Sequence, residues 1–315
     1  MAIYTAHDAI GQREDLVDVI YNISPTETPF MSSIGKTKAT AVYHEWQTDS
    51  LAAATTNNAA VEGADASDAT LSPTTRLGNY TQILQKTIKV SGTLDTVNKA
   101  GRKSEKAYQL AKASQELKRD LETILLSNQG RDAGSSNSSA RKMGSLLSWI
   151  KTNSSAQTNG ADPTTIGVST RTDGNTRTFT EQLLKDVVAE VFTSGGNPSV
   201  LMVGAAGKQK VSSFAGIGAT RFNVTGAKPS TIIGAADIYV SDFGNISVVP
   251  NRFMRTRDAL VLDPEYAAVA YLRPFQTNEL AKAGDADKTQ ILVECTLEVK
   301  NEAAHGIVAD LNMSL

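Results

Sequence analysis

The sequence predicts a mixed α+β fold for this chain of 315 residues. Some segments repeat apolar side chains at steps of three and four, which is typical of helices, and others alternate apolar with polar residues, which is typical of strands. Helical and strand-like segments follow one another without an evident internal repeat. The last part of the chain is the richest in strands, which are expected at residues 259–262, 267–272, 290–299 and 306–311.

The N-terminal part of the chain predicts a short helix followed by an extended segment. The helix is expected at residues 13–21. Pro25 and Pro29 follow it, four residues apart. Because proline fixes its own φ and restricts the residue before it, we expect a stiff, extended arm here.

Two runs with a period of two predict a long β-hairpin. Residues 41–47 read AVYHEWQ and residues 80–90 read YTQILQKTIKV, and we expect these two runs to pair. Between them, residues 52–76 carry only two bulky apolar side chains, Val61 and Leu71. A structureless loop of this length is unusual inside a compact domain. We therefore expect the hairpin to reach across to a neighbouring subunit.

A long helix is predicted to follow the hairpin, beginning at Asp95 or Thr96 and ending near Ser127. At 1.5 Å per residue it would span about 45 Å. Its apolar residues form one thin stripe, and its other face is charged. That charged face fits either a solvated surface or a contact with another subunit, and the sequence leaves both open.

The middle of the chain alternates polar and apolar stretches. A core segment is expected around Trp149, and the polar stretch 152–178 predicts a loop or a mobile insertion between domains. Thr178 and Glu181 then have the spacing of a capping box at the start of a helix. Further on we expect a strand at 199–203, a short helix after 204–207, and a hairpin of strands 238–240 and 246–249.

Composition restricts the class of protein. Apolar residues make up 40% and charged residues 20% of the chain, and no apolar run approaches the ~18 residues of a membrane helix, so a globular protein is expected. The N-terminus has no basic region followed by an apolar segment, so we expect no secretory signal. A net charge of −2 argues against a general nucleic-acid binder. The single cysteine, Cys295, excludes an internal disulfide, and its alternation with aliphatic residues favours a packed core position.

Motifs for catalysis are weak or missing. The three histidines, His7, His44 and His305, lie in separate segments without metal-ligand spacing. The run from Gly204 to Gln209 is placed like a phosphate loop, but two residues stand between its glycines where four are needed. We therefore expect no catalytic residue, no bound metal and no cofactor.

Four segments carry a resemblance to a known family. They read DLVDVIYNISPTETPFMSSIG from Asp15, HEWQTDSL from His44, VEG from Val61, and ALVLDPEYAAVAYLRPF from Ala259. In this order they resemble the major capsid proteins of tailed phages with the Hong Kong 97-type fold. The likeness covers nearly the whole chain and is most specific at its two ends.

The resemblance implies an α+β fold in which an arm and an extended loop each lie over an adjacent subunit. Some relatives carry a helical scaffold segment before the arm, whereas this sequence begins at the arm. The resemblance therefore also implies either a separate scaffolding protein or prior cleavage of such a segment. The implied parts are an N-terminal arm 1–38, an extended β-hairpin loop 39–91, a peripheral domain with a long spine helix 92–159, an inserted axial domain 160–287, and C-terminal strands of the peripheral domain 288–315.

The function that the resemblance implies is mechanical. Many copies would form hexamers and pentamers of an icosahedral shell around packaged double-stranded DNA, assembled in the host cytoplasm and kept in the virion. Implied partners are other copies, a portal protein, scaffolding and decoration proteins where these are used, and DNA through weak contacts, but no membrane. The alternatives are an encapsulin-type nanocompartment shell and, more remotely, a soluble phosphate-binding enzyme.

The residues expected at contacts between subunits come from the arm, the loop and the long helix. They are Pro25, Pro29, Phe30, Trp46, Val61, Glu62, Leu71, Arg102, Lys103 and Arg119. Some relatives also join a loop lysine to a neighbour's asparagine by an isopeptide bond. Residues 52–76 contain no lysine, and Lys86 and Lys89 lie lower on the returning strand, so a non-covalent shell is expected.

Overall fold

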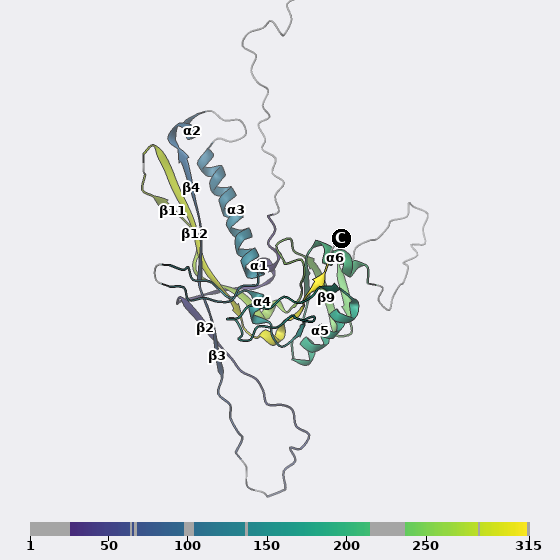
Figure 1. Cartoon of the computed structure of the whole chain (residues 1–315). Helices are drawn as coiled ribbons and strands as arrows, with labels where there is room; N and C mark the ends of the chain where they lie inside the picture. Colours follow the sequence, from purple (N-terminus) through teal and green to yellow (C-terminus); the bar gives the residue numbers. More distant parts are fainter. Residues whose placement is uncertain are drawn as a thin grey trace, which may run out of the picture.

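The computed structural model describes residues 26–63, 65, 68–97, 104–135, 138–214, 237–282 and 284–313. The helix predicted at 13–21 lies outside the described residues, as do Pro25, Arg102 and Lys103. Figure 1 shows three parts: a blade of long strands with one helix along it, a compact part around a second sheet, and a loop that projects away from both.

The blade is a four-stranded sheet in the order β1-β11-β12-β4. β12 lies between β11 and β4 and runs antiparallel to both, whereas β1 is parallel to β11. The predicted C-terminal strands are present here and are longer than expected. The strands are β1 (Gly35–Lys38), β4 (Gln82–Ser91), β11 (Ala267–Leu280) and β12 (Ala286–Val299).

The helix along the blade is shorter than predicted. The sequence predicts one helix over residues 95–127, but α2 (Gly92–Thr96) ends where Val97 takes an extended backbone conformation. α3 (Glu105–Leu125) begins separately, and its N-cap Ser104 accepts a hydrogen bond from the backbone three residues later. The prediction of a single long helix was wrong because the spacing of apolar residues is the same before and after the break. The break itself depends on backbone conformation and capping, which that spacing does not show.

The predicted hairpin has a different pairing. β2 (Tyr43–Thr48) pairs with β3 (Thr75–Tyr80), and not with residues 80–90. The run at 80–90 instead forms most of β4, which pairs with β12. Only Thr81 separates β3 from β4, so the period of two continues while the chain passes from one sheet to another. The sequence pattern could not reveal that change of partner.

The core of the blade lies between α3 and the sheet. Leu117, Leu121 and Leu125 of α3 are at most 1% exposed and share one apolar cluster with alternate residues of β12. Cys295 belongs to this cluster with 0% exposed, as predicted, and burial raises the pKa of its thiol to about 12. α4 (Leu146–Trp149) closes the lower end of the cluster with the buried Trp149, which also confirms the expected core segment.

The compact part is a sheet of six strands in the order β5-β13-β10-β7-β9-β8, covered by two helices. It has its own apolar cluster, centred on residues such as Val187, Leu201 and Val308. The predicted strand, short helix and hairpin of this region are all confirmed. The elements are β5 (Ser154–Ser155), α5 (Glu181–Thr193), β7 (Val200–Val203), α6 (Ala205–Ser212), β8 (Ile238–Ser241), β9 (Gly244–Pro250), β10 (Ala259–Leu262) and β13 (Gly306–Val308).

Helix α5 begins at a different cap from the one predicted. Thr178 belongs to the short strand β6 (Arg177–Thr178), which pairs with β14 (Leu311–Asn312). Thr180 is the N-cap, and its side chain accepts a hydrogen bond from the backbone N–H of Leu183. The prediction of a capping box at Thr178 was wrong because a second threonine, Thr180, directly precedes the first residue of the helix and caps it.

The described residues complete the fold with three short helical turns. They are α1 (Pro29–Ser33), η2 (Pro264–Tyr266) and η3 (Glu302–Ala304). Among all the described helices, none combines the length and the apolar character needed to cross a membrane.

Leu117→Ala should lower the free energy of unfolding of the subunit by about 2 to 5 kcal/mol, because it leaves a cavity under β12. Leu110→Ala is the matched control, since Leu110 lies on the same helix and is only half-buried. Urea unfolding followed by circular dichroism measures both. An equal loss for the two variants would contradict the placement of Leu117 in the core.

Candidate subunit interface

The loop between β2 and β3 is the part of the chain that contributes least to its own fold. Every described residue from 49 to 76 is exposed. Leu51, Val61 and Leu71 are 98%, 79% and 88% exposed, although each could bury a large apolar area elsewhere. The described part of the chain therefore leaves these three side chains open to contact with another molecule.

The root of this loop, in contrast, is fixed to the chain. His44 Nε2 lies 3.1 Å from Glu298 Oε2 on β12, and the buried Asn79 amide donates to the carbonyls of Gly144 and Leu297. Trp46 packs on Trp149 with ring centroids 5.3 Å apart. The hairpin therefore leaves the body at a fixed position and carries an unsupported loop.

The N-terminal segment is held by a buried carboxylate. Glu122 of α3 accepts hydrogen bonds from the backbone N–H groups of Phe30 and Met31, at 2.7 and 2.9 Å. Its Oε1 also accepts from the side-chain amide of Asn251, at 2.7 Å. Burial raises the pKa of Glu122, although the three donors oppose that shift. One side chain thus ties the arm, the helix and the end of β9 together.

The described residues among those expected at subunit contacts fall into three groups. Val61, Glu62 and Leu71 lie on the exposed loop, where a neighbour can reach them. Phe30 has 0% of its surface exposed and lies in the core of its own chain, so it anchors the arm and has no surface to offer a neighbour in this conformation. The other described ones are half-buried: Pro29 begins α1, Trp46 packs at the hairpin root, and Arg119 lies over the ring of Phe253.

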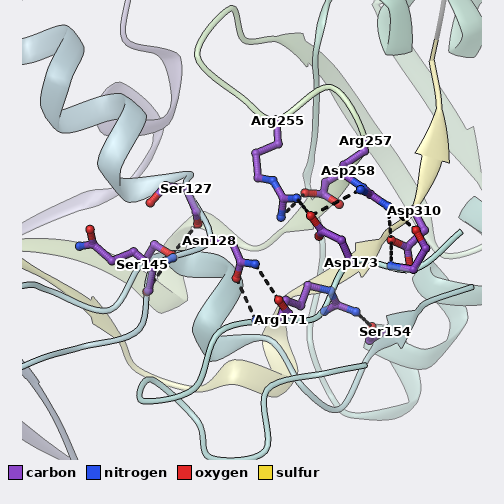
Figure 2. Close-up of polar contacts among 12 residues, drawn as sticks. Ser127, Asn128, Ser145, Ser154, Arg171, Asp173, Arg255, Arg257, Asp258 and Asp310 are labelled. Carbon is purple, nitrogen blue, oxygen red and sulfur yellow. Dashed lines mark hydrogen bonds and ion pairs between the residues drawn. The ribbon is translucent and has the colours of Figure 1, made fainter. Parts of the chain in front are cut away.

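Residues 152–178 do not form the mobile insertion that the sequence predicts. Figure 2 shows a cluster of arginines and carboxylates that holds this stretch against the second sheet. Arg255 Nη2 lies 2.5 Å from Asp173 Oδ2, and Arg257 Nη2 lies 2.8 Å from Asp310 Oδ1. The stretch is largely a loop, as one of the two alternatives predicted. The mobile insertion was wrong because the anchoring side chains of Arg255, Arg257 and Asp310 lie 82 to 153 residues away from the groups that they hold, where no local pattern reveals them.

The same cluster also reaches the end of α3. The side chain of Arg171 is 2% exposed, and its Nη2 lies 2.5 Å from Asp162 Oδ1 and 2.7 Å from the hydroxyl of Ser154. Its backbone exchanges two hydrogen bonds with the side chain of Asn128, just after the helix (Figure 2). The cluster therefore joins the end of α3 to the compact part through the Asn128 amide. Its own charges are paired, which is the form in which buried charges are tolerated.

The described residues offer little for catalysis. They contain no group of three or more histidine, cysteine, aspartate or glutamate side chains that could hold a metal. His305 is fully buried, and burial lowers its pKa to about 4. One surface cavity of about 850 Å³, between α1 and β11, is lined by two lysines but by no carboxylate and no histidine.

Comparison with known proteins decides the family. A model of the SU10 major capsid proteins matches residues 3–312. The chain belongs to this family. It is also 30% identical to the major capsid protein of Escherichia phage Phieco32 over 345 aligned positions, which cover 97% of this chain and 96% of that protein.

Solved structures show the Hong Kong 97-type fold. The capsid of cyanophage A-1(L) matches with a TM-score of 0.68 and 12% identity, over 95% of this chain and 97% of that one. The SrpI encapsulin of Synechococcus elongatus PCC 7942 matches with a TM-score of 0.58 and 12% identity, over 100% and 98%. At such identities the structures establish the fold, while the family rests on the sequence matches.

The cluster in Figure 2 should show a characteristic response to pH. Burial raises the pKa of Asp258 from 3.8 to about 6, against the opposing charge of Arg255. Between these two values the folded state holds the proton that the unfolded chain has lost, so stability falls as pH rises. Relative to Asp258→Asn, the wild type should lose about 1 to 2 kcal/mol between about pH 5 and pH 8.

Urea unfolding of the unassembled subunit at the two pH values measures this difference. Asp49→Asn, in the exposed loop, is the control and should follow the wild type at both. A constant difference between wild type and Asp258→Asn would show that the carboxyl of Asp258 is ionised throughout.

Proposed function

We propose that many copies of this chain assemble into a closed icosahedral shell that encloses packaged double-stranded DNA in a phage virion. Membership of a family of major capsid proteins supports this role. The observation that carries it is the loop at 49–74, whose described residues are all exposed in a single chain and which stands on a firmly anchored hairpin. Such a segment is explained if a neighbouring copy covers it.

The proposed division of labour follows the parts of the fold. The arm and the loop clasp neighbours, the blade with α3 forms the peripheral wall, and the compact part gathers near the five-fold and six-fold vertices. The expected boundary at 287/288 falls inside β12, and β13 joins the second sheet. We therefore propose that the C-terminal strands serve both the peripheral and the axial domain.

The proposed shell can be held by weak contacts. Each copy engages several neighbours, so modest contacts act together in a closed lattice. Further proposed partners are a portal protein, scaffolding and decoration proteins where these are used, and DNA through weak contacts, with assembly in the host cytoplasm. No enzymatic activity is part of this role.

An encapsulin-type compartment is the second candidate, supported by the fold of the SrpI encapsulin. The sequence match to phage capsid proteins favours the DNA-filled shell. Electron microscopy of particles from infected cells, with nuclease-protected nucleic acid measured in the same fractions, distinguishes the two. Particles that hold double-stranded DNA support the proposal, and particles filled with a protein cargo would favour the alternative.

The exposed loop should be needed for assembly but not for folding. Replacing residues 52–72 by a short Gly-Ser linker should leave the circular dichroism and the urea midpoint unchanged, because no described residue of this stretch is buried. Sedimentation should then show free subunits and few particles. Loss of the fold, or assembly at the normal rate, would contradict the role of the loop as a clasp.

The shell should contain no covalent bonds between subunits. Lys86 contacts Glu116 and Asp120 of its own chain at 2.9 and 3.2 Å. Burial alone would lower its pKa, but these carboxylates raise it overall, so its amine stays protonated and is a poor nucleophile. Particles boiled in detergent without reductant should run as one band near 33.5 kDa. A ladder of larger bands would show cross-linking.

A further inference from the structure

Two adjoining cavities follow helix α3 on the side of β11. One, of about 850 Å³, lies between α1 and β11, and the other, of about 500 Å³, lies between α3 and β11. Both are lined by Phe275, so they meet at its ring and form one depression, which we call the α3 groove. Figure 1 shows α3 lying along the blade with α1 at its lower end, where the groove begins.

The groove exists because β11 loses its outer neighbour and its regular register at this point. β1 pairs with β11 only as far as Tyr271. Between Tyr271 and Gln276 the pairing of β11 with β12 shifts register twice, and such irregularities bend a strand locally. The bent segment contains Pro274 and Phe275, which line the groove.

The walls of the groove are apolar and incompletely covered. Tyr271 and Phe275 are only half-buried, although aromatic rings gain much from burial. On the opposite wall, Ala107 and Ala111 stand one turn apart on α3 and are exposed. Such small side chains leave room for a second helix to approach α3 closely.

The charge of the groove is positive. Lys36 and Lys118 line it and are exposed, and no ion pair within the described residues involves either of them. No residue of the lining carries a carboxylate. An occupant that fits this groove therefore combines an apolar face with negative charge.

The segment 13–21, which lies outside the described residues, has this combination in its sequence. As the helix that the sequence predicts, it would place its bulky apolar side chains on one face, because they recur at steps of three and four. Two carboxylates would flank that face, one at each border. The apolar residues are Leu16, Val17, Ile20 and Tyr21, and the flanking carboxylates are Glu14 and Asp15.

The connection to the groove is short. Thr28 lines the groove, and seven residues of chain separate it from Tyr21. Even fully extended, this connection spans at most about 25 Å. The segment therefore has a high effective concentration at the groove of its own chain, which favours docking there over a site on a separate molecule.

We infer that residues 13–21 form a helix that docks in the α3 groove of the same chain, with its carboxylates beside Lys36 and Lys118. The docked helix covers the exposed alanines of α3 and the half-buried rings of β11. It belongs to the fold of the subunit, and it leaves the residues before it for contacts with a neighbour. This inference goes beyond the proposed shell and does not depend on it.

Disulfide trapping in the unassembled full-length subunit tests the docking. The only native cysteine, Cys295, is 0% exposed and supplies no competing thiol. The test variant carries Val17→Cys and Ala111→Cys, and mild oxidation should link these two cysteines within one chain. The control carries Val17→Cys and Ala133→Cys, because Ala133 is exposed and lines a different cavity together with Ile83. It should form no link.

The charge contact is tested in the same background. Adding Lys36→Glu and Lys118→Glu to the Val17→Cys, Ala111→Cys chain should slow the formation of the link by roughly fivefold or more, because like charges then face each other. Lys142→Glu, at an exposed lysine outside the groove, is the matched control and should leave the rate unchanged. Circular dichroism confirms that each variant is folded, and mass spectrometry of the digested, unreduced protein identifies the linked peptides.

The other outcomes contradict the inference in distinguishable ways. Links between chains without links within a chain would assign the groove to the arm of a second copy. No link, or equal rates for Ala111→Cys and Ala133→Cys, would show that the segment does not dock in the groove. An unchanged rate after both lysine reversals would remove the carboxylates from Lys36 and Lys118. Since every measurement uses the free subunit, none of these results bears on the shell.

Discussion

The central strand β12 is the constraint on which the described structure depends. It pairs with β11 through eleven residues and with β4 through ten, so its position fixes the whole blade. One face of it packs against α3 through Val293, Cys295 and Leu297. The other face places Glu294 and Glu298 where Arg141 and His44 meet them, which fixes the root of the projecting hairpin. The root of the hairpin and the blade therefore keep a fixed spatial relation.

The sequence predicted the strands and helices whose burial is periodic. The C-terminal strands, the buried Cys295 and the apolar face of α3 followed from spacing alone, because one buried face imposes a regular pattern. The pairing of β2 with β3 did not follow, because a strand that changes sheet at Thr81 keeps its alternation. The prediction of one continuous helix was wrong for a related reason. The break near Val97 depends on backbone conformation and not on the spacing of apolar residues.

The interface was predicted in outline but not in detail. A long loop with few bulky apolar side chains is visible in the sequence, and Val61 and Leu71 lie on it as expected. Phe30 also looks like an arm residue in the sequence, yet it is buried because Glu122, 92 residues later, binds its backbone. The polar cluster around Arg171 depends on partners that the fold brings together. No local pattern contains that information.

Hydrogen exchange of the free subunit and of the assembled shell tests the central claim most directly, that the loop is structured by neighbours and the blade by its own chain. In the free subunit, amides at 49–74 should exchange as fast as unprotected ones, while β12 is strongly protected. In the shell, β12 should stay protected and the loop should gain protection. A loop already protected in the free subunit, or still unprotected in the shell, would contradict the account.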